Sequence, residues 1–169
     1  ANGTRAFAHG TGSNATGDFS FAQGRNTIAS GFAAHAEGLG TIAKGAYSHA
    51  EGRNTVASGS YSNTQGRLTT ASGDYSHAEG YGTIASGNYQ LVAGQFNTPN
   101  PSDNSAFIIG DGTSNSSRSN ILFVGNNKIE LNAPITASSN ISSSGIVYMT
   151  TASIGGGLFT SASLAAGGG

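Results

Sequence analysis

Glycine recurs at every seventh position of this chain, from Gly3 to Gly94, without a single interruption. The seven-residue units alternate between two kinds, such as RNTIASG at 25–31 and AYSHAEG at 46–52. The true repeat is therefore 14 residues long and has two unlike halves. A repeat this regular constrains the fold more strongly than local propensity does, because each unit must make the same contacts with its neighbours.

A period of seven residues would suit a coiled coil, but the rest of the pattern excludes one. A coiled coil needs two apolar positions in each heptad, whereas most of these units have at most one. Each glycine would also cost a helix about 1 kcal/mol relative to alanine. A collagen triple helix is excluded as well, because it needs glycine at every third residue.

As pairs of short β-strands, the two halves are consistent with one fold. In T-I-A-S-G, the Thr and Ala side chains point to one side of a strand, and Ile and Ser point to the other. We expect two strands to face each other across a thin interior, with glycine permitting the corners. The coils would then stack about 4.8 Å apart. The expected interior residues are Ala22, Ala29, Ala36, Ala43, Ala50, Ala57, Ala71, Ala78 and Ala85, and the expected corner glycines are Gly24, Gly31, Gly38, Gly45, Gly52, Gly59, Gly66, Gly73, Gly80 and Gly87.

The composition excludes several other classes of protein. Large aliphatic residues are sparse among the 27 glycines, which argues against a thick core. The absence of cysteine excludes a disulfide scaffold and a thiolate metal site. A net charge of −1 gives no basic footprint for nucleic acid, so we expect no nucleic-acid partner. No apolar run approaches the roughly 18 residues that cross a membrane, so we expect no membrane partner.

The units RNTIASG and AYSHAEG resemble the repeats of YadA-like heads of trimeric adhesins. The same S-x-A-x-G register occurs in tail-fibre and tailspike proteins of bacteriophages. The resemblance covers residues 3–94 and departs at Thr64, Gln90 and Val92. It implies an all-β fold, a left-handed parallel β-roll whose three chains lie side by side as a homotrimeric rod.

Three regions are expected along the chain. Residues 1–94 are the β-roll repeats, and residues 95–135 are a β-rich connector. In the connector, SAFIIG and ILFVG have the composition of buried strands, and GNNK predicts a tight hairpin turn between ILFV and KIEL. The segment 106–131, with SRSN between two strands, resembles what often follows such rolls in phage virion proteins. Residues 136–169 are rich in Ser, Gly and Ala and are expected to form a fibre segment or tail.

An apolar row on the outer side of the second strand predicts self-association. Ile28, Ile42, Val56 and Ile84 recur once per coil, with Thr70 interrupting the row. Stacked coils would merge these residues into one exposed stripe, which a single thin roll has no means of burying. We interpret the stripe as a subunit interface, with packing against another part of the chain as the alternative. The number of three subunits comes from the resemblance.

Two other repeated rows have a structural and a functional interpretation. His35, His49 and His77 share a face with Glu37, Glu51 and Glu79, which would suit a zinc-like ion. Asn63 and Gln65 interrupt that row, so we favour a solvated strand face and expect no metal. The aromatic residues Phe19, Tyr47, Tyr61, Tyr75 and Tyr89 are possible surface contacts that stack sugar rings, or a cross-coil stack that stabilises the roll. We favour the second interpretation.

Catalysis has little support in the sequence. Most acidic residues are repeat positions that sister units fill with Ser, Gln or Ala, whereas a glycosidase needs two carboxylates at one sugar bond. No phosphate loop, nucleophile elbow or metalloprotease motif is present, so we expect neither an enzyme nor a cofactor.

The expected function is therefore structural and adhesive. The chain is expected to be a rigid segment of a phage tail fibre or related virion appendage, located on the virion, with host cell-surface glycan or protein and other virion proteins as partners. The first alternative is the head of a bacterial trimeric autotransporter adhesin on the cell surface, which binds host matrix. The second is the non-catalytic part of a tailspike hydrolase. The sequence leaves the ligand unnamed.

Overall fold

A computed structural model describes residues 1–134, except 103, 105 and 126, together with the backbone of 151–154 and 157–160. Residues Ala1–Pro134 form one compact unit and Ile135–Gly169 another. Within the second unit, β17 (Thr151–Ile154) and β18 (Gly157–Thr160) pair as an antiparallel hairpin. The rest of the predicted segment 136–169 lies outside the described residues.

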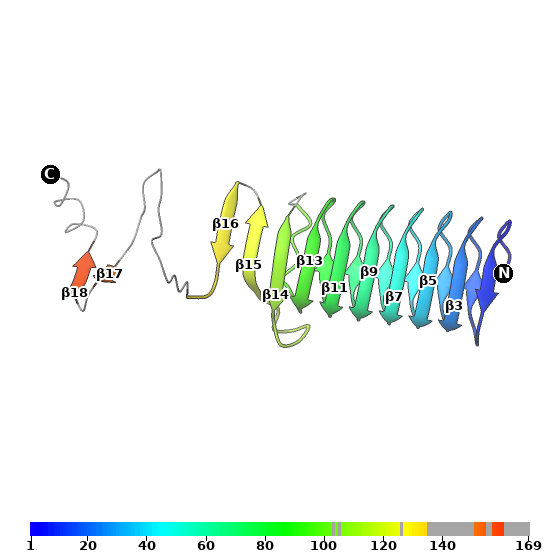
Figure 1. Ribbon diagram of the computed structural model, residues 1–169, viewed down its shortest axis with the longest axis horizontal. Coiled ribbons are helices and arrows are strands. Elements are labelled where there is room, and N and C mark those ends of the chain that lie inside the picture. Colours follow the sequence, from blue (N-terminus) through cyan, green and yellow to red (C-terminus); the bar gives the residue numbers. More distant parts are fainter. Residues whose placement is uncertain (103, 105, 126, 135–150, 155–156, 161–169) are drawn as a thin grey trace. The chain divides into compact units, whose positions relative to one another are not determined.

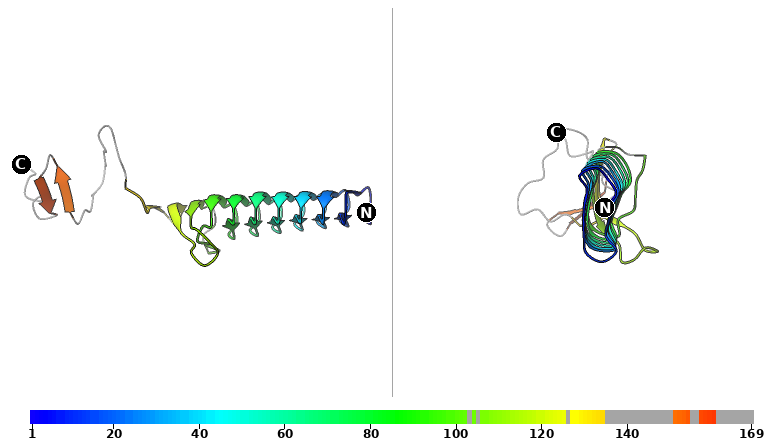
Figure 2. Two further views of the ribbon diagram at one scale, coloured as in Figure 1. Left: turned by 90° about the horizontal axis from the view of Figure 1, so that it is seen from below. Right: turned by 90° about the vertical axis from the view of Figure 1, so that its right-hand side faces the viewer.

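The first unit is a β-roll of stacked parallel coils that makes about seven turns, which confirms the predicted all-β roll (Figures 1 and 2). The predicted homotrimer stays a prediction. Each coil contributes one strand to a long-strand sheet and one to a short-strand sheet, called here the long sheet and the short sheet. The long strands are β1 (Phe7–His9), β3 (Phe21–Arg25), β5 (His35–Leu39), β7 (His49–Arg53), β9 (Asn63–Arg67), β11 (His77–Tyr81) and β13 (Leu91–Gln95). The short strands are β2 (Asn14–Ala15), β4 (Ile28–Ala29), β6 (Ile42–Ala43), β8 (Val56–Ala57), β10 (Thr70–Ala71) and β12 (Ile84–Ala85).

The interior of the roll is a single layer of small side chains. Ala22 of the long sheet and Ala29 of the short sheet have no exposed surface, and Thr27 and Ser20 beside them are equally enclosed. The register advances by one repeat per coil, so Ala22 pairs with Ala36 and Ala29 with Ala43. All nine alanines expected in the interior have 0% relative exposure. The end-on view shows how narrow the space between the two sheets is (Figure 2).

The repeated glycines have a different role from the one expected of them. Gly38 is the fourth residue of β5, inside the strand, with φ of 116°. Gly45 begins a corner turn by accepting a hydrogen bond from the Ser48 amide at 3.2 Å, but it does not adopt a left-handed conformation. In both glycine rows, the backbone of the next coil leaves no room for a side chain. A Cβ at Gly38 would lie 2.1 Å from the carbonyl oxygen of Gly52, and a Cβ at Gly45 would lie 1.9 Å from that of Gly59.

The left-handed positions at the corners are filled mostly by other residues. One corner has Tyr47, Tyr61, Tyr75 and Tyr89 at φ between 55° and 58°. The opposite corner alternates between Asn and Gly in its first coils, as at Gly40 and Asn54. Asparagine tolerates this conformation because its short side chain can bond locally. A tyrosine does not, so its presence there has to be stabilised by other contacts.

The short sheet ends at β12, where two side chains take the place of a further strand. The Asn97 carboxamide accepts a hydrogen bond from the Ile84 amide at 2.7 Å and donates one to the Ile84 carbonyl at 3.0 Å. The Gln90 carboxamide oxygen accepts bonds from the amides of Ser86 and Gly87. These contacts satisfy backbone groups that would otherwise face no partner.

The long sheet continues past this point. β14 (Phe107–Asp111) pairs parallel with β13, and β15 (Asn120–Gly125) and β16 (Lys128–Leu131) follow as antiparallel strands (Figure 1). Ile108 and Phe123 face inward and are buried. The roll therefore gives way to a single sheet at its C-terminal end.

Replacement of one intercoil glycine tests how tightly the coils approach. We expect Gly52→Ala to destabilise the fold by about 3 kcal/mol, because its Cβ would overlap the backbone of Gly66. Gly40→Asn is the matched control, since Asn54 holds the same corner in the next coil and only its flexible side chain would have to move. Urea unfolding followed by circular dichroism measures both variants. Equal stability of the two would contradict the role assigned to the glycine rows.

Candidate functional site

The outer surface of the roll consists of rows of side chains that repeat once per coil. Because the interior admits mainly small residues, the large and charged side chains of the coils point outward, except Gln90 and Val92 of the last coil, which are buried. Four such rows follow the roll: one on the short sheet, one on the long sheet and one along each corner. A fifth surface lies on the sheet that extends beyond the last coil.

The row on the short sheet is the isoleucine stripe, formed by Ile28, Ile42, Val56, Thr70 and Ile84. Register pairs Ile28 with Ile42, Ile42 with Val56, and Thr70 with both Val56 and Ile84. Ile28 is 37% exposed, and the others are half-buried by their neighbours in the row. The predicted stripe is thus continuous, apart from the threonine, on the outer side of the short strands.

The corner that follows each short strand has an aromatic ladder: Phe19, Phe32, Tyr47, Tyr61, Tyr75 and Tyr89. Neighbouring ring centroids lie between 4.9 and 5.6 Å apart, and the four tyrosine rings are parallel to within 9°. Sequence comparison of the coils missed Phe32, because it lies one residue earlier in FAAHAEG than the tyrosine does in AYSHAEG. Its displaced ring still fills the gap between Phe19 and Tyr47.

Stacking determines which parts of these rings are accessible. Tyr47, Tyr61 and Tyr75 are each about half exposed, at 50%, 50% and 53%. Their faces lie against neighbouring rings, so the ladder presents ring edges and hydroxyl groups. A sugar that stacks on an aromatic ring needs the face. The geometry therefore disfavours sugar stacking along the ladder. It favours the other interpretation, in which the rings stack on one another and stabilise the roll.

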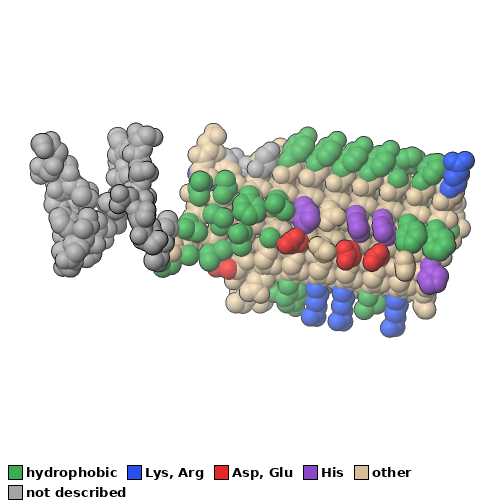
Figure 3. Space-filling model, in the orientation of Figure 1, with side chains coloured by type: hydrophobic (Ala, Val, Ile, Leu, Met, Phe, Trp, Pro, Cys, Tyr) green, Lys and Arg blue, Asp and Glu red, His purple; other side chains and the backbone are tan. Residues whose placement is uncertain are grey.

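The corner that precedes each short strand has a row rich in arginine: Arg25, Leu39, Arg53, Arg67, Tyr81 and Gln95, here called the arginine row. These residues end successive long strands and pair in register. The Arg67 guanidinium lies 5.0 Å from the centre of the Tyr81 ring. Among the described residues, Arg25 and Arg53 have no acidic partner. Figure 3 shows cations along one edge of the roll and hydrophobic side chains along the other.

The outer face of the long sheet has the predicted His and Glu residues at its centre (Figure 3). The His35 and His49 rings stack at 4.7 Å, and His35 Nε2 lies 3.4 Å from Glu37 Oε2. His77 and Glu79 repeat that pair at 3.4 Å. Within the described part of the chain, no three His, Cys, Asp or Glu residues are grouped so that they could hold a metal ion.

Burial affects the protonation of His35. Desolvation lowers the pKa of the His35 imidazole below its usual value, and the charge of a protonated His49 lowers it further. Glu37 and Glu51 oppose the shift. The neutral imidazole is therefore the form that the folded chain favours at this position.

An apolar patch covers the outer side of the sheet beyond the last coil. Its members are Leu91, Phe107, Ile109, Leu122, Val124, Ile129 and Leu131. Ile129 is 75% exposed, and Leu91 and Leu131 are 43% and 41% exposed. The sequence predicted buried strands in this region, and this was only half right. Alternate residues such as Ile108 are buried, whereas Phe107 and Ile109 belong to the exposed face.

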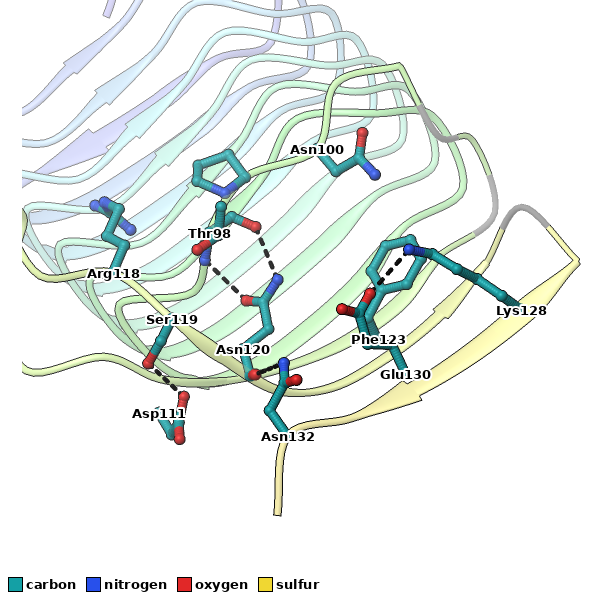
Figure 4. A pocket seen from close by; sticks show the side chains of 11 residues that line it. Thr98, Asn100, Asp111, Arg118, Ser119, Asn120, Phe123, Lys128, Glu130 and Asn132 are labelled. Atoms are coloured by element: carbon teal, nitrogen blue, oxygen red, sulfur yellow. Dashed lines mark hydrogen bonds and ion pairs between the residues drawn. The ribbon is translucent and has the colours of Figure 1, made fainter. Parts of the chain in front are cut away.

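Within the connector, an open pocket of about 610 Å³ lies between residues 98–100 and the strands β14 to β16 (Figure 4). Most of its polar side chains bond to each other or to nearby backbone. Asn120 exchanges hydrogen bonds with the Thr98 backbone, Ser119 donates to Asp111, and Lys128 bonds Glu130 at 2.8 Å. These groups hold the connector in place and leave few of their bonds free for a ligand.

Arg118, from the SRSN segment, fixes the connector to the roll. Its guanidinium donates hydrogen bonds to the carbonyl oxygens of Gly82 at 2.8 Å and Asn97 at 3.0 Å. The same group lies 5.7 Å from the centre of the Phe96 ring. The residues by which the sequence resembled phage connectors therefore have a direct structural role.

The two aspartates of the repeats, Asp18 and Asp74, also bond to backbone. Asp18 accepts a hydrogen bond from the Thr4 amide at 2.7 Å, and Asp74 accepts one from the Ser60 amide at 2.8 Å. Each carboxylate thus joins its own corner to the corner of the preceding coil. These positions support the corner backbone, which accounts for their recurrence along the roll.

The lowered pKa of His35 predicts a loss of stability on acidification. The unfolded chain binds a proton near pH 6.5, while the folded chain resists it, so stability falls as the pH drops through 6.5 towards the lower pKa of the folded state. We expect the melting temperature to fall between pH 7.5 and pH 5.5. His35→Asn, which copies Asn63 of the same row, should show a smaller fall. An equal fall in both proteins would exclude His35 as the cause.

Comparison with known families agrees with the geometry. A family model described as the YadA head domain repeat matches residues 1–26, 22–48, 36–62 and 65–89. Among curated proteins, no sequence matches the chain at a significant level. No helix in the described residues is long and apolar enough to cross a membrane. With its repeat, its small-residue interior and this match over half of its length, the chain belongs to the YadA head domain repeat family, a family of structural adhesin domains.

Proposed function

We propose that the chain is a homotrimeric segment of a surface fibre that acts as a rigid spacer and attachment element. The observation that supports this most directly is the isoleucine stripe. It is an apolar row on a roll too thin to bury it, in a chain whose family provides heads or fibres of trimeric adhesin type. Isoleucine and valine side chains gain about 1.5–3 kcal/mol each when they are fully buried.

The shape of the roll supports a three-fold arrangement. The isoleucine stripe lies on the outer side of the short sheet and follows the stacking direction of the coils. Three such faces can surround one axis, so that every Ile28, Ile42, Val56 and Ile84 side chain points towards the centre. Small interior side chains keep each roll thin, which lets the three rolls lie close together.

The backbone supports the spacer role. Parallel ladders join successive coils in both sheets as far as β12, and the glycine rows bring the backbones of neighbouring coils into close contact. A stiff trimeric rod presents three copies of any binding surface at fixed separation. Multivalent display of this kind raises avidity without any new contact.

We favour a phage virion appendage as the setting, with a host cell-surface glycan or protein as receptor. Support comes from the connector, because Arg118 of the phage-like SRSN segment anchors it to the last coil. The first alternative remains a bacterial trimeric autotransporter head that binds host matrix. The second alternative is the non-catalytic part of a tailspike hydrolase.

A charge in the isoleucine stripe tests the trimer. Light scattering should give the wild-type chain three times its monomer mass of 16.8 kDa. Ile42→Asp should shift the protein to monomers, because an unpaired buried carboxylate carries a large desolvation cost. Ile42→Thr, which copies Thr70, should stay trimeric with a lower melting temperature. A monomeric wild-type protein would refute the proposal.

A further inference from the structure

The aromatic ladder and the arginine row lie on opposite sides of the isoleucine stripe. In each coil the chain passes from the arginine row, as at Arg25, through the short strand at Ile28 to the aromatic corner at Phe32. Each roll therefore has an aromatic edge and a cationic edge on either side of its short sheet. The two edges are the parts of that face that lie farthest from its centre.

The two rows cannot contact each other within one chain. Tyr47 precedes β7 and Arg53 ends it, so the two residues lie at opposite ends of one long strand. At about 3.3 Å per residue, the six residues between their Cα positions span roughly 20 Å. A contact between the rows can form only between chains.

A closed ring of three identical chains brings unlike edges together. In such a ring each chain contacts its two neighbours through two different surfaces. When the short sheets of three chains face one axis, the leading edge of each sheet meets the trailing edge of the next. We infer that the aromatic ladder of each chain packs against the arginine row of its neighbour, an inference that rests on the proposed trimer.

The residues of the two rows can be matched along the roll. Three-fold symmetry keeps equivalent residues at one height, so we expect each aromatic residue to meet the neighbour's copy of the arginine-row residue that ends the long strand following that aromatic residue. Four tyrosines then meet a side chain that can form hydrogen bonds, and Phe32 meets an aliphatic one. The pairs are Tyr47 with Arg53, Tyr61 with Arg67, Tyr75 with Tyr81, Tyr89 with Gln95, and Phe32 with Leu39. Phe19 with Arg25 departs from the pattern.

The chemistry of the exposed atoms fits this pairing. Ring stacking leaves the phenol hydroxyls and ring edges accessible, and a hydroxyl oxygen can accept a hydrogen bond from a guanidinium N–H. The apolar stem of an arginine can cover the ring edges at the same time. Within the residues that the structure describes, Arg53 has no acidic partner, so its guanidinium is available.

Backbone strain points to the same surface. Tyr47, Tyr61, Tyr75 and Tyr89 all occupy left-handed positions, which glycine would fill without a steric penalty. Stacking along the ladder accounts for part of the compensation. A bulky side chain held in that conformation in four coils is consistent with a further contact outside the chain.

Crosslinking between introduced cysteines tests the pairing, because the natural chain has none. The main variant combines Tyr61→Cys with Arg67→Cys and is treated with a short bismaleimide. A direct disulfide is unsuitable, since it requires Cβ atoms about 3.8 Å apart, closer than two long side chains in contact would place them. We expect denaturing gels to show a covalent trimer. The double variants Tyr61→Cys with Arg53→Cys and Tyr61→Cys with Tyr81→Cys cover a shift of one coil either way.

Controls separate this inference from the proposed function. Tyr61→Cys combined with Glu51→Cys places the second thiol on the long-sheet face and should give no trimer, and each single variant should give no crosslink. Light scattering before treatment shows whether each variant is trimeric. A trimer that none of the three test pairs crosslinks would overturn the edge pairing and leave the proposed function intact. Dimers from Tyr61→Cys alone would overturn it too, because like edges would then meet.

Discussion

The close approach of one coil to the next is the constraint on which the rest of this structure depends. At the two glycine rows, the carbonyl oxygen of one coil occupies the space in which a Cβ of the preceding coil would lie. No other residue fits there, so the chain must return to glycine every seven positions. This contact sets the coil spacing at all points of the roll and brings equivalent side chains close enough to form continuous rows. The aromatic ladder, the isoleucine stripe and the paired His and Glu residues all follow from it.

The thin interior moves the specific features of the protein to its surface. In a conventional domain, side chains of many shapes interdigitate in a closely packed core, and this packing makes the fold specific. Here the core is a column of alanines with threonine and serine beside them, the same in nearly every coil. What differs between faces is the chemistry of the outer rows: apolar on the short sheet, polar on the long sheet, aromatic on one edge and cationic on the other. Such a chain is suited to side-by-side assembly more than to enclosing a substrate.

The interior and the isoleucine stripe could be predicted from the sequence, because strand alternation alone places Ala29 inward and Ile28 outward. The sequence could not show why glycine recurs. Corner turns and close backbone approach both select glycine, and only the structure separates them. Phe32 was not predicted as a member of the aromatic ladder, because it lies one residue out of the repeat register, although its ring occupies the same ladder. Phe107, Ile108 and Ile109 are all apolar, so the sequence did not show that Ile108 alone faces inward. The hydrogen bonds by which the Asn97 side chain replaces a further strand correspond to no recognisable pattern in the proline-rich loop.

The termination of the short sheet has a consequence for how such fibres change over time. Asn97 and Gln90 contact the backbone of Ile84, Ser86 and Gly87, all within the final coil. The cap therefore recognises that coil alone and is indifferent to how many precede it. Duplication or loss of a 14-residue segment upstream leaves the junction unaltered and changes the rod by about 4.8 Å. Length becomes a heritable property that recombination between near-identical repeats adjusts in uniform increments.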